Sequence, residues 1–118
     1  MLKIYTLAQC STCRDATDWL RENKIAFDER AIRETPPTLS ELRAMLTAHG
    51  GEIRRLFNTS GLEYRAQKLA EKLPGLSEAA ALTLLADNGS LVKRPFAIGD
   101  KVALSGFDPK RWEAALLH

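Results

Sequence analysis

The first third of the chain alternates between apolar runs and an amphipathic segment. Residues 2–6 form a short apolar and β-branched run, which is typical of a buried strand. After a polar turn, Ala16, Trp19 and Leu20 recur at helical spacing, and residues 25–32 alternate loosely as a second strand. Two strands joined through one helix favour parallel pairing. The chain is therefore predicted to open with a β-α-β unit.

The middle of the chain predicts a block of helices. Thr38 and Glu41 have the spacing of a capping box, in which each residue satisfies a backbone N–H at the start of a helix. Residues 52–88 carry further helical pattern, with interruptions predicted at 58–61 and 74–75, where turn-forming residues gather.

The last part of the chain returns to strands and ends on a helix. Residues 96–98 and 102–104 flank a short turn that suits a hairpin, and Asp108 before a proline predicts the start of the terminal helix. The predicted order is β-α-β, helices, then β-β-α, which gives an α/β fold with a mixed sheet. We expect one domain over residues 1–118, with a helical insertion at about 38–90 between the second and third strands.

Composition narrows the class of protein. A chain of 118 residues with 45% hydrophobic and 27% charged residues fits one globular core that folds alone, and we expect a monomer. A net charge of +2 is too small for a nucleic-acid surface, so no direct nucleic-acid binding is predicted. No apolar run approaches a membrane span, and the first ten residues become polar too soon for a signal peptide. We expect a cytoplasmic protein that does not contact membranes.

The chemistry predicted for this chain centres on its two cysteines. Cys10 and Cys13 lie between the first predicted strand and helix, where the helix dipole and the free N–H groups around Ser11 and Thr12 favour an anion. Arg14 adds a positive charge nearby. The spacing also allows an intramolecular disulfide. We therefore predict that Cys10 attacks as a thiolate and that Cys13 resolves the product.

Two alternatives for the cysteine pair remain open. Zinc needs about four ligands, whereas the sequence has two histidines and no second cysteine pair, so a metal would need a bridged dimer. No metal site is predicted. The pair could also be inert buried thiols, since free cysteine is often buried. Its place at a strand-to-helix turn favours redox chemistry over both alternatives.

Further cations are candidates for binding an anionic substrate. Arg94 stands with Lys93 just before the third predicted strand, and Pro95 follows at a position where strands tolerate proline. Arg54 and Arg55 follow a Gly-Gly break and could also present a cation to an anionic ligand. The alternative for all four charged residues is an ordinary solvated surface.

Several segments in register resemble one known family. The segments YTLAQCSTCRDATDWL, ETPPTLSEL, LFNTSGLEYR, LVKRP and LSGF resemble the arsenate reductase-like family that includes ArsC, Spx and YffB, over nearly the whole length. The resemblance implies a thioredoxin-like fold with a helical insertion. It also implies that Cys10 is the nucleophile, that Arg94 lies near it, and that Pro95 follows a cis peptide bond.

The branches of this family imply different functions. Glutathione-coupled arsenate reductases use two further arginines, of which one could align with Arg54, while the other falls near Ser105, where LSGF has no arginine. The second cysteine, Cys13, resembles Spx, in which the pair is a redox switch on a regulator that contacts RNA polymerase. The turn LFNTSG resembles the YffB branch, regarded as thiol reductases.

Two functions are therefore predicted. The first is a cytosolic thiol-disulfide oxidoreductase that acts on a small thiol or oxyanion substrate, holds no bound cofactor, and is reduced by glutathione, thioredoxin or glutaredoxin. The alternative is an Spx-like redox-sensing transcriptional regulator that binds the RNA polymerase α subunit.

Overall fold

The structure is a computed structural model that describes residues 1–117. The predicted domain ends at His118, which lies outside the described residues. None of the helices in residues 1–117 is long and apolar enough to cross a membrane.

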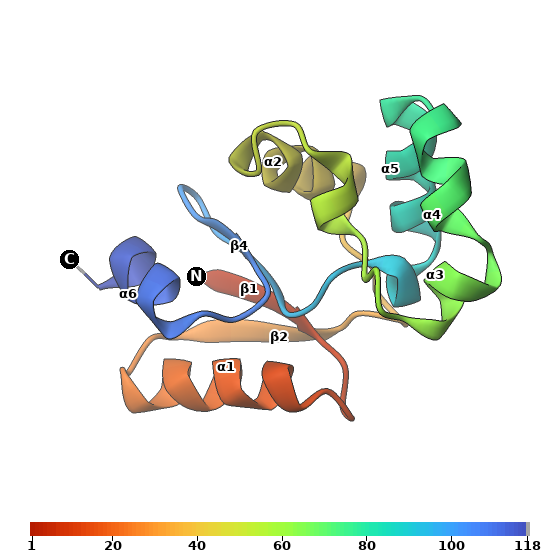
Figure 1. The fold of residues 1–118 in the computed structure, drawn as a ribbon. Helices are drawn as coiled ribbons and strands as arrows, with labels where there is room; N and C mark the ends of the chain where they lie inside the picture. The colour runs from red at the N-terminus through yellow and green to blue at the C-terminus, as the bar shows by residue number, and fades with distance from the viewer. Residues whose placement is uncertain (118) are drawn as a thin grey trace.

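Four strands form one mixed sheet, as the sequence predicts (Figure 1). Their order across the sheet is β2-β1-β3-β4. β1 pairs with β2 in parallel and with β3 antiparallel, and β3 and β4 form the predicted hairpin. The strands are β1 (Leu2–Thr6), β2 (Phe27–Ala31), β3 (Phe96–Ile98) and β4 (Ala103–Ser105). The second strand is shorter than predicted, and the fourth begins and ends one residue later than predicted.

The helices follow the predicted order, and those of the insertion all lie between β2 and β3. They are α1 (Ser11–Glu22), α2 (Leu39–Ala48), α3 (Leu62–Ala66), α4 (Leu69–Lys72), α5 (Glu78–Asp87) and α6 (Pro109–Leu116), with 3₁₀ turns η1 (Ile53–Leu56), η2 (Leu73–Gly75) and η3 (Gly89–Leu91). The region over 52–88 is more fragmented than predicted. Lys68 adopts a left-handed backbone conformation with φ of 53°. A residue in this conformation interrupts a right-handed helix, so α3 and α4 are separate.

The helix starts behave as their sequences predict. The Thr38 hydroxyl accepts a hydrogen bond from the Glu41 N–H while the Glu41 carboxylate accepts one from the Thr38 N–H, which completes the capping box of α2. Asp108 caps α6 through the Lys110 N–H, and Ser77 caps α5. These local hydrogen bonds set where each helix begins.

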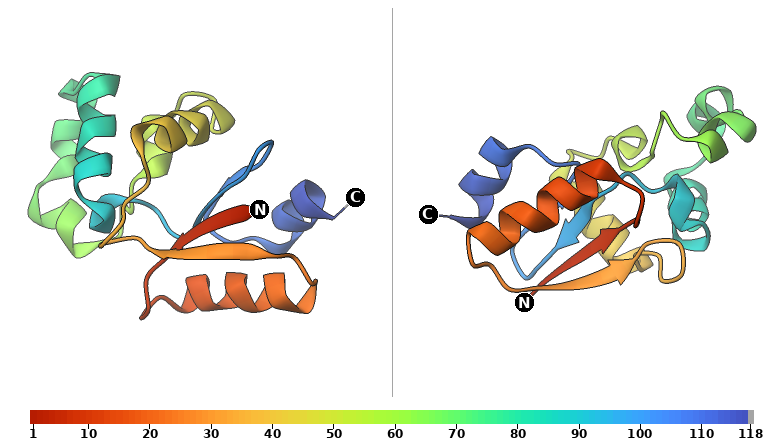
Figure 2. Two further views of the ribbon diagram at one scale, coloured as in Figure 1. Left: turned by 180° about the vertical axis from the view of Figure 1, so that it is seen from behind. Right: turned by 90° about the horizontal axis from the view of Figure 1, so that it is seen from below.

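The two faces of the sheet bury different helices (Figures 1 and 2). Ile4 and Ala97 point to the face covered by α1 and α6, where they meet the fully buried Trp112. Tyr5 and Phe96 point to the opposite face, where α2 and α5 pack. Alternate residues of each strand therefore serve opposite cores, as the period of a strand requires.

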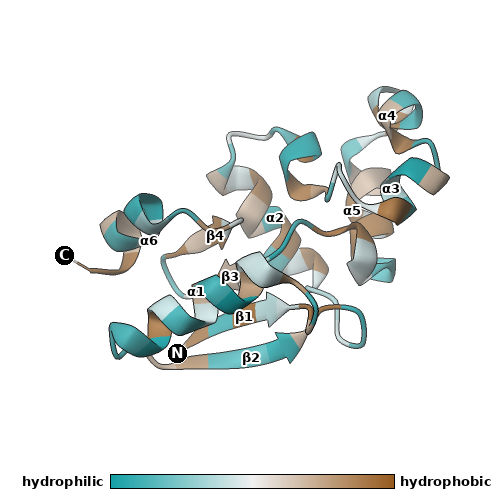
Figure 3. Ribbon diagram, turned by 60° about the horizontal axis from the view of Figure 1, so that its bottom comes forward, coloured by the Kyte–Doolittle hydropathy of each residue, from teal (hydrophilic) through white to brown (hydrophobic). Residues whose placement is uncertain are grey.

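The edge strand β2 is hydrophilic. Figure 3 shows the middle of β2 in teal, where the sequence reads Asp28, Glu29 and Arg30. The Arg30 guanidinium lies 2.8 Å from a carboxylate oxygen of Asp28. Charged side chains on an exposed edge strand disfavour pairing with a strand of another molecule.

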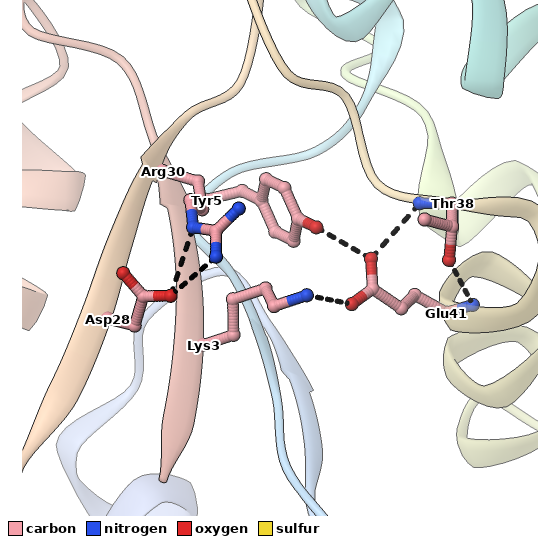
Figure 4. A network of polar contacts seen from close by, with 6 residues as sticks. All are labelled: Lys3, Tyr5, Asp28, Arg30, Thr38 and Glu41. Carbon is pink, nitrogen blue, oxygen red and sulfur yellow. Dashed lines mark hydrogen bonds and ion pairs between the residues drawn. The ribbon is translucent and has the colours of Figure 1, made fainter.

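A polar network ties β1 to the first helix of the insertion (Figure 4). One Glu41 carboxylate oxygen accepts the Tyr5 hydroxyl at 2.6 Å, and the other accepts the Lys3 ammonium at 2.9 Å. Burial opposes ionisation of Glu41, but the hydrogen bonds from Tyr5 and Lys3 outweigh it and lower the pKa of its carboxyl. Burial and the bond to Glu41 also raise the pKa of the Tyr5 hydroxyl above its ordinary value.

Glu41→Gln is expected to lower the free energy of unfolding by about 2 kcal/mol at pH 7, because the amide nitrogen cannot accept the bonds that the carboxylate accepts. Since folding depresses the pKa of Glu41, its contribution is present above the unfolded value of about 4.3 and is lost as the pH falls through the folded value. Urea unfolding at several pH values measures both effects. Asp28→Asn removes an exposed carboxylate, also shown in Figure 4, and serves as the control. Equal losses in the free energy of unfolding for the two variants would contradict the expectation.

Candidate active site

The strand topology brings four chain segments to one edge of the sheet. Cys10 follows β1, and Arg33 follows the parallel strand β2, so both lie beyond the carboxyl ends of their strands. Because β3 runs antiparallel to β1, its amino end, preceded by Arg94, is at the same edge. The carboxyl end of β4, followed by Gly106, completes the set. This edge of an open α/β sheet is where ligands usually bind.

These segments line an open pocket of about 730 Å³. Cys10, Ser11 and Thr12 come from the start of α1, and the turn at 58–61 comes from the insertion. The pocket also takes in Arg94, together with the exposed side chain of Leu62 at the start of α3. In Figure 1 the amino end of α1, the end of β2 and α3 lie on the same side of the molecule. The volume is within the range of small-ligand sites.

Cys10 is the N-cap residue of α1. Its Sγ accepts a hydrogen bond from the Cys13 backbone N–H at 3.2 Å, and its backbone is extended, with φ of −93° and ψ of 110°. The side chain is half-buried and borders the pocket, so it is accessible to a substrate. A thiolate at this position is stabilised by the N–H hydrogen bond that it accepts and by the positive end of the helix dipole.

Cys13 lies one turn into α1 in a different environment. It is only 2% exposed, and both cysteines are free thiols. Burial, and then the hydrogen bond from its thiol to Cys10, raise the pKa of Cys13 to about 12, although the charge of Arg94 acts in the opposite direction. Cys13 therefore stays protonated at neutral pH, while Cys10 is the accessible sulfur.

Arg94 is held at the pocket by the insertion. Its Nη1 donates to the Ser90 carbonyl oxygen at 3.3 Å, and the Arg33 Nε donates to the Ser90 hydroxyl at 3.0 Å. Arg33, Ser90 and Arg94 all line the pocket that Cys10 borders. The peptide bond between Arg94 and Pro95 is cis, and Pro95 is buried and does not line the pocket. Two guanidinium groups are thus organised by one residue of η3.

The other candidate cations are distributed around this pocket. Arg14 is exposed and lines a smaller cavity of about 190 Å³. Cys10 and Cys13 also line this cavity. Arg54 lines a neighbouring pocket of about 760 Å³ and does not line the Cys10 pocket. Cys10, Ser11, Thr12 and Arg94 are therefore brought together, and Arg54 lies apart from them.

Sequence reasoning missed Arg33 and Ser90. Arg33 carried a usable signal, because it follows the second strand of a parallel pair and so falls at the same edge as Cys10. Ser90 carried no such signal, because its position depends on how η3 packs against the end of β2.

Among residues 1–117, no group of three or more His, Cys, Asp or Glu side chains is arranged to hold a metal ion.

A family model described as the ArsC family matches residues 5–115. The chain belongs to the ArsC family. The uncharacterized protein YusI of Bacillus subtilis is 42% identical over 113 residues, covering 95% of each chain. The global transcriptional regulator Spx of Enterococcus faecalis is 34% identical over 108 residues, covering 92% of this chain and 80% of Spx.

Solved structures of related proteins have the same fold. An ArsC family related protein from Bacteroides fragilis superposes with a TM-score of 0.90 at 40% identity, covering 97% of this chain and 96% of the other. The predicted membership of the ArsC, Spx and YffB group and the thioredoxin-like fold are thereby confirmed. The ArsC family includes both reductases and regulators, so the function of this member has to be argued from its own site.

Proposed function

We propose that the protein is a cytosolic thiol-disulfide oxidoreductase in which Cys10 is the nucleophile and Cys13 the resolving cysteine. The observation that carries the proposal is the difference between the two sulfurs. The Cys10 sulfur borders the pocket and accepts the cap hydrogen bond of α1, whereas Cys13 is buried and protonated. One sulfur is available to attack, and the other is held in reserve one turn away.

The reaction on a disulfide substrate proceeds in two exchanges. The Cys10 thiolate attacks one sulfur of the substrate, forms a mixed disulfide and releases the other half as a thiolate. Cys13 then loses its proton and attacks the Cys10 sulfur, which forms the Cys10–Cys13 disulfide and releases the second thiol. Two electrons pass from the cysteine pair to the substrate. Glutathione, thioredoxin or glutaredoxin restores the two thiols by the reverse exchange.

The site offers donors to an anionic group, but it lacks one arginine that the resemblance implies for arsenate binding. Arg94, Arg33 and the N–H groups around Ser11 and Thr12 offer donors to an anionic group beside Cys10. Ser105, where the resemblance would put a further arginine, is buried and bonded to the ring of His49 at 2.7 Å. It adds no charge to the pocket, so arsenate would be held by fewer cations than in the glutathione-coupled reductases.

The second candidate function is an Spx-like regulator that senses redox state and binds the RNA polymerase α subunit. The 34% identity with Spx of Enterococcus faecalis and the presence of Cys13 favour it. Retention of the α subunit by the protein in only one redox state would support this candidate. Absence of retention under both oxidising and reducing conditions would remove it.

Cys13→Ala is expected to trap the reaction at its first exchange. Alanine keeps an apolar side chain at this buried position but cannot attack the mixed disulfide. On incubation with glutathione disulfide, the variant should accumulate one glutathione adduct on Cys10, whereas the unmodified protein should proceed to the Cys10–Cys13 disulfide. Intact mass spectrometry without reductant distinguishes the two products. A protein that forms neither product with any small disulfide would contradict the proposed function.

A further inference from the structure

A small cavity between α1 and β2 is lined by both cysteines. We call it the α1–β2 cavity, and its volume is about 190 Å³. Its other polar lining residues are Thr6 from β1, Arg14, Thr17 and Arg21 from α1, and Glu29 from β2. The cavity therefore brings a carboxylate and the two sulfurs to one polar space, separate from the Arg94 side of the Cys10 pocket.

The strand register places Glu29 on the face of the sheet that α1 covers. Glu29 pairs with Ile4 in the parallel register of β1 and β2, and Ile4 belongs to the core under α1. Paired residues of neighbouring strands point to the same face of a sheet. Helix α1 runs beside β2 in Figures 1 and 2. The position of the carboxylate is thus set by a strand of the sheet.

One short segment of the chain contacts both the carboxylate and the buried sulfur. The buried Thr6 hydroxyl donates a hydrogen bond to a Glu29 carboxylate oxygen at 2.6 Å. The next residue, Leu7, forms a backbone hydrogen bond to Cys13 that lowers the pKa of its thiol. The Glu29 carboxylate and the Cys13 sulfur are therefore both held at residues 6–7.

The second exchange of the proposed reaction requires that Cys13 lose its proton. Cys13 is 2% exposed, and burial raises the pKa of its thiol to about 12, which leaves little thiolate at neutral pH. Only the thiolate attacks a disulfide. A base that accepts the proton while the new sulfur–sulfur bond forms removes this obstacle, and such a base typically accelerates a reaction by about a hundredfold or more.

We propose that Glu29 accepts the proton of Cys13 during the second exchange, through water held in the α1–β2 cavity. This inference rests on the proposed function and adds a residue to it. A polar cavity of this size holds several water molecules, and one water can carry a proton between two groups that do not touch.

The step balances without a further reactant. As Cys13 attacks the Cys10 sulfur, its proton passes to the carboxylate, the bond between Cys10 and the substrate sulfur breaks, and the substrate half leaves as a thiolate. Glu29 then returns the proton to solvent, because its side chain is exposed.

The test measures the two exchanges separately. In the Cys13→Ala background, Glu29→Gln should form the glutathione adduct at the parent rate, because the first exchange does not involve Cys13. With Cys13 present, the same substitution should slow conversion of the adduct to the Cys10–Cys13 disulfide about a hundredfold. Intact mass spectrometry of acid-quenched samples gives both rates. Glu29→Asp keeps a carboxylate and should recover part of the lost rate.

The pH dependence of the second exchange distinguishes a proton acceptor from a structural role. Between about pH 7 and 9, the parent rate should change little, because an ionised carboxylate accepts the proton. The Glu29→Gln rate should rise about tenfold per pH unit, because it follows the fraction of Cys13 thiolate. The other charged groups near the two sulfurs are Arg14, Arg21 and Arg94, and arginine keeps its charge throughout this range.

Asp28→Asn is the matched control. Asp28 neighbours Glu29 on β2, is ion-paired with Arg30, and lines neither the Cys10 pocket nor the α1–β2 cavity. Both of its rates and its pH dependence should equal those of the parent.

Three results with Glu29→Gln would overturn the inference and leave the proposed function standing. They are an unchanged second exchange, equal slowing of both exchanges, and a slowed second exchange that keeps the pH dependence of the parent. A parent whose adduct never converts to the Cys10–Cys13 disulfide would overturn both the inference and the proposed function.

Discussion

Cys10→Ser is expected to abolish reduction of a small disulfide, with a fall in rate of at least about a thousandfold, because a serine hydroxyl is not ionised at neutral pH and cannot exchange with sulfur. Serine is a preferred N-cap, so its hydroxyl oxygen should still accept the Cys13 N–H and preserve the start of α1. The measurement is steady-state turnover of glutathione disulfide or hydroxyethyl disulfide with an excess of reductant. Retention of the full rate would show that another group carries the chemistry.

Cys10→Ala separates the chemical role of this residue from its structural one. Both substitutions remove the sulfur, but alanine also removes the cap acceptor and should lower the free energy of unfolding by about 1 kcal/mol. Cys10→Ser should therefore unfold at the denaturant midpoint of the unmodified protein, and Cys10→Ala at a lower one. Equal midpoints for the two variants would contradict the capping role of the Cys10 sulfur.

Gly89→Ala is expected to cause the largest loss of stability among conservative changes in this chain. A Cβ at Gly89 would lie 1.8 Å from the Ile32 carbonyl oxygen, so the backbone of η3 or of the segment after β2 must move. Forcing an atom into a packed site of this kind costs about 3 kcal/mol. Urea unfolding measures the change, and no change would contradict the close packing of η3 on Ile32.

Gly75→Ala is the matched control for Gly89→Ala. A Cβ at Gly75 meets no atom within 4 Å, and its backbone is not in the left-handed region. This substitution should alter the free energy of unfolding by less than about 1 kcal/mol and can stabilise the protein, because alanine restricts the unfolded chain. Gly89→Ala should in addition weaken activity, since the neighbouring Ser90 holds both Arg33 and Arg94 at the Cys10 pocket.

Local sequence signals predicted much of the fold. Capping residues such as Thr38, Ser77 and Asp108 act within one helical turn, and the structure has all three as caps. The break at Lys68 carried no such signal, because a lysine rarely adopts a left-handed backbone. The close contact between Gly89 and Ile32 was equally invisible, because it joins positions far apart in the chain.

The candidate site likewise contains residues that the local sequence predicted and residues that it could not predict. Cys10 and Cys13 could be found from their spacing and their place before a helix, and Arg94 gained weight from the family resemblance. Arg111 could not be found, because it reaches the neighbouring pocket that Arg54 lines only when α6 packs back against the sheet. Whether Arg54 faces Cys10 or the neighbouring pocket depends on the path of η1, which no local pattern specifies.

The sulfur of Cys10 also accepts the side-chain hydrogen bond that caps the first turn of α1. Linkage between two equilibria is reciprocal, so whatever free energy the helix contributes to the thiolate, the thiolate contributes to the helix. In the proposed mechanism, the mixed disulfide puts a neutral sulfur in place of the attacking thiolate at the amino end of α1, so the first turn should fray at this stage. The fraying would release Cys13 from its buried position at the stage when it is needed to attack. The catalytic cycle and the local unfolding of one helical turn would then be the same process observed by two different methods, turnover and hydrogen exchange.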